Sequence, residues 1–212
     1  MRLSAASSRP LPRPDVAISI VGLGPAGLKH VDAATVTLVG QAETVIVRTL
    51  RHPAASELAE TRDIVTCDDL YELHSEFDDV YAAITERVLV AASAGSVVYA
   101  VPGSAVVGER AVTQIREKAS DAGFAVSVVP GLSFLDLAYV AVGIDPIADG
   151  LQIIDARDLP DPLALRLPTI VTQLDAQLRA VDVSLALTRT IDPATEVTVL
   201  DRLGDPDEVI EV

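Results

Sequence analysis

An apolar run that ends in closely spaced glycines constrains the fold of this chain more than any other feature. Residues 16–20 (VAISI) lead directly into residues 21–27 (VGLGPAG). A buried strand that runs into glycines brings bare backbone close to a ligand in α/β proteins. The spacing approaches a dinucleotide fingerprint, but Pro25 removes a backbone N–H from the turn that would cradle a pyrophosphate. The turn therefore predicts a ligand other than a dinucleotide.

Strands and helices alternate through the first two thirds of the sequence. We predict strands at 16–22, 45–48, 63–67, 96–101 and 125–129, and helices at 33–40, 54–60, 78–92 and 109–122, with an irregular polar stretch at 70–77. Gly95 is expected to end the longest helix. Such alternation predicts a mostly parallel sheet. Because ligands bind outside the carboxyl ends of parallel strands, the turns at 22–27, 102–107 and 130–134 are candidate ligand walls.

The pattern changes after residue 134. A helix is expected at 135–142 and strands at 153–155, 169–174, 182–187 and 196–200. Weak helix signals in this half predict antiparallel or mixed strand pairing. We therefore expect an α/β protein with an N-terminal domain at 15–129, a C-terminal α/β domain with a mixed sheet at 130–212, and a disordered lead-in at 1–14.

Composition excludes some classes of partner. Half of the 212 residues are hydrophobic, only 3% are aromatic and none is Trp, so the core is aliphatic, which suits buried parallel strands. The net charge of −15, from 16 basic and 31 acidic residues, argues against nucleic acid or an anionic membrane as a partner. With one cysteine and no apolar leader, we expect a cytoplasmic protein without a multi-cysteine metal site.

Few side chains are candidates for a catalytic role. His52 is a candidate for substrate contact, with a structural role in its turn as the alternative. The acidic residues between 68 and 79 predict a solvated face, so we predict no metal site. Cys67 reads as structural because no basic residue adjoins it in the sequence.

Taken together, the three turns resemble those of the tetrapyrrole (corrin/porphyrin) methylases, which are S-adenosylmethionine-dependent methyltransferases. A closer resemblance is to the methylase-like N-terminal domain of MazG-type nucleotide pyrophosphohydrolase fusions. It is carried by RTLRHP at 48–53, DDLY at 68–71, DVY at 79–81, VYAVPG at 98–103, VPGLSFL at 129–135 and GIDP at 143–146. The resemblance implies two α/β domains, a cofactor cleft between them and a homodimer.

The resemblance also implies which residues bind the cofactor. By motif, the first turn contributes Gly24 and Pro25, and the third contributes Ser133 and Phe134. The second turn contributes Gly103, Ser104 and Val107, and Leu174 in the C-terminal domain closes over the adenosine. No catalytic residue is named, because methyl transfer depends mainly on alignment of the methyl group with its acceptor.

Two acidic residues of the family pattern are absent. The first turn reads Gly-Pro-Ala-Gly at 24–27 where the family usually has Gly-Pro-Gly-Asp, and the second reads Gly-Ser-Ala at 103–105 where Gly-Asp-Pro is common. Ser104 offers only neutral hydrogen bonds, which are about half as strong as charge-assisted ones.

Three functions are therefore weighed. The first is a methyltransferase that converts S-adenosylmethionine to S-adenosylhomocysteine, with an unknown small-molecule acceptor for which a tetrapyrrole is one candidate. The second is a non-catalytic cofactor-binding or dimerisation module associated with a nucleoside triphosphate pyrophosphohydrolase. The third, a nucleotide-binding oxidoreductase, is disfavoured by Pro25 and by Arg48, which stands where an acidic residue would follow the second strand.

Overall fold

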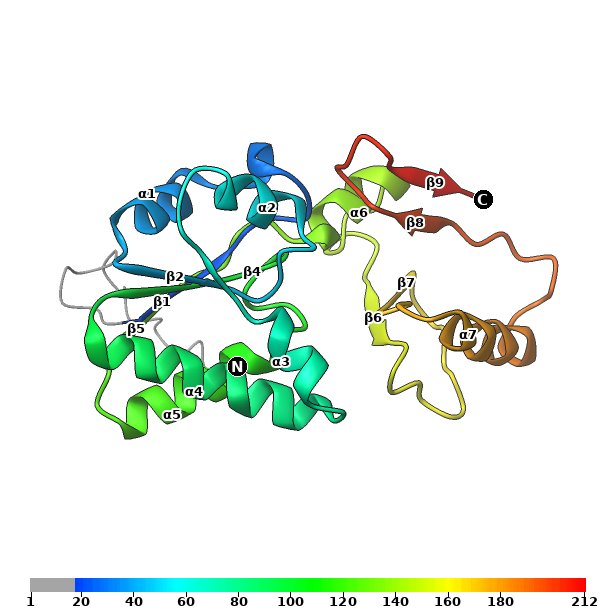
Figure 1. Ribbon diagram of the computed structural model, residues 1–212. Coiled ribbons are helices and arrows are strands. Elements are labelled where there is room, and N and C mark those ends of the chain that lie inside the picture. The colour runs from blue at the N-terminus through cyan, green and yellow to red at the C-terminus, as the bar shows by residue number, and fades with distance from the viewer. Residues whose placement is uncertain (1–17) are drawn as a thin grey trace, which may run out of the picture. The chain divides into compact units, whose positions relative to one another are not determined.

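The computed structural model describes residues 18–212, which divide into two compact units (Figure 1). The first unit extends to Phe134 and also includes the segment Arg202–Asp207. The second comprises Leu135–Asp201 and Glu208–Val212. The lead-in expected at residues 1–14 lies outside the described residues. The domain boundary near residue 130 stays a prediction.

The first unit contains a parallel sheet, as predicted. Its five strands lie in the order β3-β2-β4-β1-β5. They are β1 (Ile18–Gly22), β2 (Thr44–Val47), β3 (Val65–Thr66), β4 (Val97–Val101) and β5 (Val126–Val129). All five predicted strands are confirmed, although β3 is shorter than expected. Because β4, β1 and β5 are neighbours, the turns that follow them emerge side by side at one edge of the sheet.

Helices cover both faces of this sheet. Figure 1 shows α1 (Ala33–Gln41) and α2 (Pro53–Ala59) over one face, and α3 (Asp68–Leu73), α4 (Phe77–Ala94) and α5 (Arg110–Asp121) over the other. A short 3-10 helix, η1 (Leu28–His30), follows the first turn. Alternate residues of β4 pack into separate cores: Val97 and Tyr99 face α4 and α5, whereas Val98 faces the other side. Each large aliphatic side chain buried in this way contributes about 1.5–3 kcal/mol.

The helix ends follow local chemistry. Asp32 accepts a hydrogen bond from the backbone N–H of Thr35 at 2.8 Å and so caps α1. Gly95 ends α4, as predicted. The irregular stretch predicted at 70–77 was wrong, because it holds most of α3 and the first residue of α4. Asp68 and Asp69 lie in the first turn of α3, where carboxylates stabilise a helix dipole.

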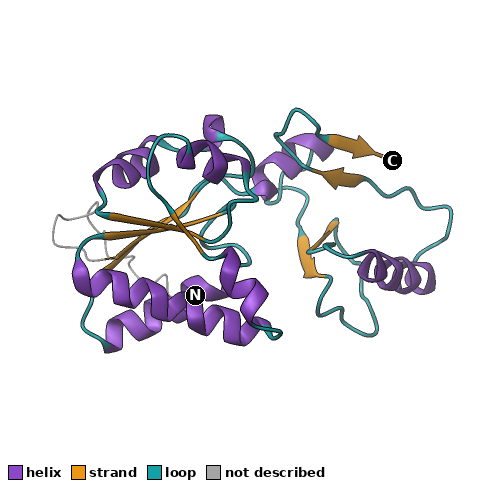
Figure 2. Ribbon diagram, viewed as in Figure 1, coloured by secondary structure: helices purple, strands orange, loops and turns teal. Residues whose placement is uncertain are grey.

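The second unit is built from smaller pieces (Figure 2). It contains α6 (Phe134–Val142, of which Phe134 belongs to the first unit), the parallel pair β6 (Gln152–Asp155) and β7 (Thr169–Thr172), α7 (Gln177–Thr190), and the antiparallel pair β8 (Val199–Asp201) and β9 (Val209–Glu211). Both pairing directions occur, but in two separate two-stranded sheets rather than in the one mixed sheet expected. No helix within residues 18–212 combines the length and apolar character needed to cross a membrane.

The strand predicted at 182–187 was also wrong, because these residues lie inside α7. Leu178, Val181 and Leu185 recur at spacings of three and four, which is the helical period. Arg179 also pairs with Asp175 one helical turn earlier. The prediction failed because apolar residues alternate at 181–187, which is also the pattern of a half-buried strand. The strand expected at 196–200 is confirmed only at its end, in β8.

Candidate functional site

The three predicted turns are joined through their backbones at the carboxyl edge of the first sheet. Gly24 and Gly103 exchange two hydrogen bonds: the N–H of Gly24 donates to the carbonyl of Gly103 at 3.0 Å, and the reverse bond measures 2.7 Å. The N–H of Ala105 donates to the carbonyl of Pro130 at 2.7 Å. The turns after β1, β4 and β5 therefore form one connected surface.

Close backbone approach explains the glycines in these turns. A Cβ on Gly22 would overlap the carbonyl oxygens of Pro130 and Gly103, and one on Gly131 would overlap the backbone of Gly22. Gly24 and Gly103 adopt φ values of 72° and 65°, a region that favours glycine. A Cβ on Gly103 would meet no atom within 4 Å. The backbone at Gly103 is thus bare on a side that has room for another molecule.

The residues predicted to bind a cofactor fall into two groups. Seven of them lie on the three joined turns of the first unit: Gly24, Pro25, Gly103, Ser104, Val107, Ser133 and Phe134. Ser104 and Ser133 are buried, and Pro25, Val107 and Phe134 are half-buried. Leu174 belongs to the second unit, where it follows β7 and is 49% exposed. Gln173 just before it has φ of 64°. The cofactor role of all eight residues stays a prediction.

A fourth turn, which follows β2, carries charged groups that the sequence did not connect. Arg48 comes directly after β2, and Glu109 precedes α5 at the end of the loop after β4. Nη1 of Arg48 lies 2.9 Å from Oε1 of Glu109, whose side chain is only 5% exposed. The one available signal was a carboxylate in the otherwise uncharged loop at 102–109, together with a cation directly after a buried strand.

Burial strongly perturbs the groups around this ion pair. Desolvation raises the pKa of Glu109 to about 7, and the charge of Arg48 opposes this rise. Desolvation also raises the pKa of Tyr99, whose hydroxyl is buried without a hydrogen-bond partner within the described residues. The pKa of the half-buried Tyr71 rises to about 12 for the same reason. Glu109 is therefore the one of these acids that titrates near neutral pH.

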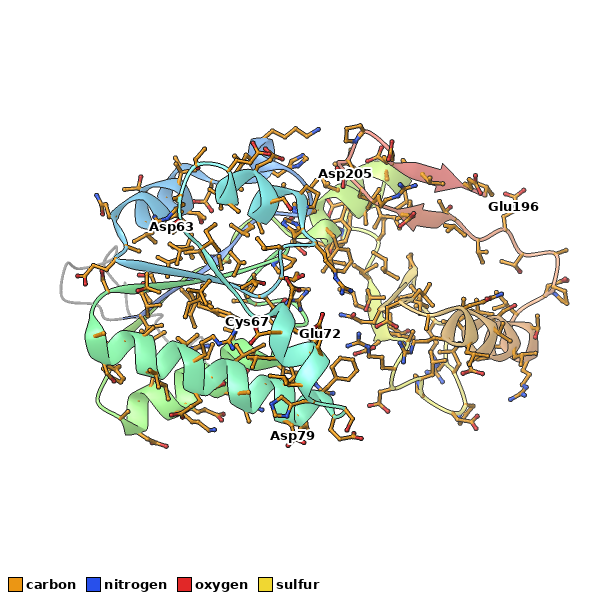
Figure 3. All side chains as sticks on the ribbon, viewed as in Figure 1. Asp63, Cys67, Glu72, Asp79, Glu196 and Asp205 are labelled. Atoms are coloured by element: carbon orange, nitrogen blue, oxygen red, sulfur yellow. The ribbon has the colours of Figure 1, made fainter. Side chains whose placement is uncertain are left out.

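His52 lies between the fourth turn and the first. The residue is 8% exposed, and within residues 18–212 neither ring nitrogen has a hydrogen bond of normal geometry. The backbone of Gly24 and Pro25 nevertheless lies close enough to the ring to interact with it. Burial is the main cause that lowers the pKa of His52. Arg48 lowers it further, whereas Asp205, labelled in Figure 3, and the nearby backbone raise it. The imidazole is therefore neutral at pH 7.

A carboxylate from α3 holds the fourth turn in place. Asp68 accepts hydrogen bonds from the hydroxyls of Thr49 and Thr66, each at 2.6 Å, and from the backbone N–H of Leu50 at 2.9 Å. These bonds lower the pKa of Asp68 against the opposing effect of desolvation. Because Arg48 and His52 flank the bonded residues, Asp68 fixes the backbone from which both side chains project.

The remaining candidates behave as structural groups. Glu72 and Asp79 are exposed on α3 and α4 (Figure 3), in agreement with the predicted solvated acidic face. Within residues 18–212, no group of three or more His, Cys, Asp or Glu residues is placed to hold a metal ion. Cys67 is buried, and desolvation raises the pKa of its thiol to about 11, so the thiol is unreactive at neutral pH.

Two sequence relatives match most of this chain. An uncharacterised protein, YabN, from Bacillus subtilis (strain 168) is 37% identical over 195 residues, which are 91% of this chain and 40% of YabN. A methyltransferase/ribosomally synthesized type I borosin cyclic peptide precursor from Coprinopsis marcescibilis is 30% identical over 149 residues, which are 67% of this chain and 37% of that protein. The chain thus spans about two fifths of the length of each relative.

The fold is also found in a solved structure. Uroporphyrin-III C-methyl transferase from Thermus thermophilus, complexed with S-adenyl homocysteine, matches with a TM-score of 0.64 and 20% identity, over 92% of this chain and 81% of that one. The family of tetrapyrrole (corrin/porphyrin) methylases matches residues 17–212. The parallel sheet, its joined strand-end turns and these matches lead to one conclusion: the chain belongs to the tetrapyrrole (corrin/porphyrin) methylase family.

Proposed function

We propose that this chain is an S-adenosylmethionine-binding methyltransferase domain whose acceptor is a small molecule. The observation that carries the proposal is the connected surface of three turns at the carboxyl edge of the sheet. Open α/β sheets bind ligands at this edge. A family relative in complex with S-adenyl homocysteine supports the same ligand class.

The groups on these turns fit a ligand held by backbone and hydroxyls. Gly103 leaves its backbone bare toward open space, and the second and third turns carry the hydroxyls of the buried Ser104 and Ser133. Pro25 has no N–H, so the first turn suits a ligand without a pyrophosphate better than a dinucleotide. When bound, S-adenosylmethionine supplies a methyl group activated on a sulfonium. In our proposal it is held by the seven residues of the three turns.

A matched pair of glycine variants tests the proposal. Gly103 and Gly123 both have positive φ, 65° and 81°, and a Cβ on either would meet no atom within 4 Å. Gly103→Ala and Gly123→Ala therefore impose similar backbone strain, but Gly123 lies at the far end of α5. We expect calorimetric titration to show S-adenosylhomocysteine binding in the wild type and in Gly123→Ala, and at least about tenfold weaker binding in Gly103→Ala.

Two results would contradict the proposal. One is the absence of S-adenosylhomocysteine binding by the folded wild type at millimolar ligand. The other is equal binding by the two glycine variants, which would place the ligand away from the second turn.

A second candidate function is a non-catalytic cofactor-binding or dimerisation module associated with a nucleoside triphosphate pyrophosphohydrolase. The serine in the second turn favours it, because Ser104 offers a neutral hydroxyl to an ammonium or ribose group where a carboxylate would add its negative charge. Cofactor binding without methyl transfer would support this function, whereas turnover on a uroporphyrinogen-like acceptor would exclude it. Both functions include the homodimer that the family resemblance implies, which light scattering on the purified chain would measure.

A further inference from the structure

The turn after β2 adds a fourth wall to the proposed site. β2 pairs with β4, so residues 48–52 emerge at the carboxyl edge next to the turn that contains Gly103. The backbone N–H of Ala54 donates to the carbonyl of Ala26 at 3.3 Å, which joins the following helix to the first turn. None of the residues expected to bind the cofactor lies on this fourth turn. It is therefore free to contact a second ligand.

Arg48 presents a fixed and partly open guanidinium on this wall. Its Nη1 faces the buried carboxylate of Glu109, and its side chain is 28% exposed. Within the part of the chain that the structure describes, the guanidinium has no other ion pair or hydrogen bond. A guanidinium carries five N–H donors in a planar fork, so one edge can hold Glu109 while another binds a second anion.

His52 gives an independent sign of a missing ligand. An imidazole that is only 8% exposed normally satisfies both ring nitrogens, because a buried polar group without a hydrogen bond destabilises the fold. In residues 18–212 neither nitrogen of His52 has a hydrogen bond of normal geometry, although the backbone of Gly24 and Pro25 lies close enough to raise the pKa of the ring. Arg48 and His52 lie four residues apart on the same turn, and the charge of Arg48 acts on this ring. The neutral imidazole has one N–H to donate and one nitrogen to accept.

We propose that Arg48 and His52 form a subsite for a carboxylate or phosphate group of the methyl acceptor. The subsite rests on the proposed function, because it is the part of the proposed methyltransferase site that would bind the methyl acceptor. Glu109 fixes the orientation of the guanidinium, and Asp68 fixes the backbone between the two side chains. Glu109 and Asp205 are the acidic groups that act on this pair. Since the whole chain carries −15, an anion gains affinity from the oriented donors rather than from a general positive field.

Inorganic phosphate and succinate serve as probes, because comparing them shows whether the subsite prefers a phosphate or a carboxylate group. Each is titrated calorimetrically into the full chain saturated with S-adenosylhomocysteine, and the side-chain N–H signals of arginine are followed by NMR. The test variants are Arg48→Gln and the double variant Arg48→Gln/Glu109→Gln, which avoids an unpaired buried carboxylate. The control is Arg110→Gln, because Arg110 is 74% exposed and lies 3.9 Å from a similarly exposed Asp78.

We expect the wild type and Arg110→Gln to bind one of the probes with a shift of the Arg48 signals. The double variant should bind S-adenosylhomocysteine as the wild type does, but lose at least about tenfold in affinity for the probe. Equal probe affinity in the wild type and the double variant would overturn the subsite. The subsite would also be overturned if the wild type binds S-adenosylhomocysteine but neither probe. A wild type that fails to bind S-adenosylhomocysteine would instead overturn the proposed function.

Discussion

Glu109→Gln should make the stability of this protein less dependent on pH. Burial raises the pKa of Glu109 in the folded chain from 4.5 to about 7. Between these two values the folded state holds a proton on Glu109 that the unfolded state has lost. The free energy of unfolding of the wild type therefore falls as the pH rises through this window. The contribution of Glu109 is fully present below pH 4.5 and is lost above pH 7.

The size of the effect follows from the shift in pKa. Each tenfold change in a protonation equilibrium corresponds to about 1.4 kcal/mol, so a rise from 4.5 to about 7 corresponds to about 3 kcal/mol. The carboxylate is 5% exposed, so solvent screens this energy little. The glutamine side chain of the variant has the shape of a protonated glutamate and does not titrate. At pH 5 the variant should be more stable than the wild type by only about 1 kcal/mol, and at pH 8 it should be more stable by about 3 kcal/mol.

Urea unfolding followed by circular dichroism at pH 5, 6, 7 and 8 measures the difference between the variant and the wild type. Glu117→Gln is the control, because Glu117 is exposed on α5, the helix that Glu109 directly precedes. The NMR shift of the Glu109 carboxyl carbon gives the protonation state directly. A constant difference from pH 5 to 8 would refute the reasoning, because the buried carboxylate would then titrate in the fold as it does in the unfolded chain.

Four further substitutions test the packing of the first unit and of the site. Gly22→Ala should destabilise the first unit by about 1–3 kcal/mol and weaken S-adenosylhomocysteine binding, because the new Cβ would overlap the carbonyl of Pro130. Gly40→Ala, on an open face of α1, should instead stabilise the first unit by about 0.5–1 kcal/mol. Chemical unfolding of both variants measures the two changes. Ile115→Ala in the fully buried face of α5 should cost about 2–5 kcal/mol by the same measurement. Asp68→Ala removes two hydrogen bonds from the fourth turn and one from Thr66 of β3, and should cost about 1–3 kcal/mol. It should also lower phosphate or succinate binding more than S-adenosylhomocysteine binding, and unchanged probe binding would contradict this.

The helices and strands of the first unit were predictable because their signals are local. Strands of Val and Ile ending at Gly or Pro occur where they were expected, and the helix that contains Val80, Ile84 and Val88 shows its apolar face directly in the sequence. The errors at 70–77 and 182–187 have a common cause. Both stretches are short or polar, and their helices bury few residues, so an apolar period gave little guidance.

The candidate site was predictable only in part. The glycines of the three turns follow directly from strand ends, and the switch-point rule brings those turns to one edge. The pairing of Arg48 with Glu109 was not predictable in this way. Neither residue follows a recognisable motif, and the interaction requires β2 to lie beside β4.

The sequence alone determined the alternation of strands and helices, the glycines at the strand ends and the family resemblance, because each of these depends on residues that are close together in the sequence. The tertiary structure alone decided that two charges from distant parts of the chain meet at a buried position, that the ring nitrogens of His52 are buried, and that Glu109 titrates near pH 7. The physical reason is that ion pairing and desolvation depend on strand order and burial, which no short stretch of sequence contains.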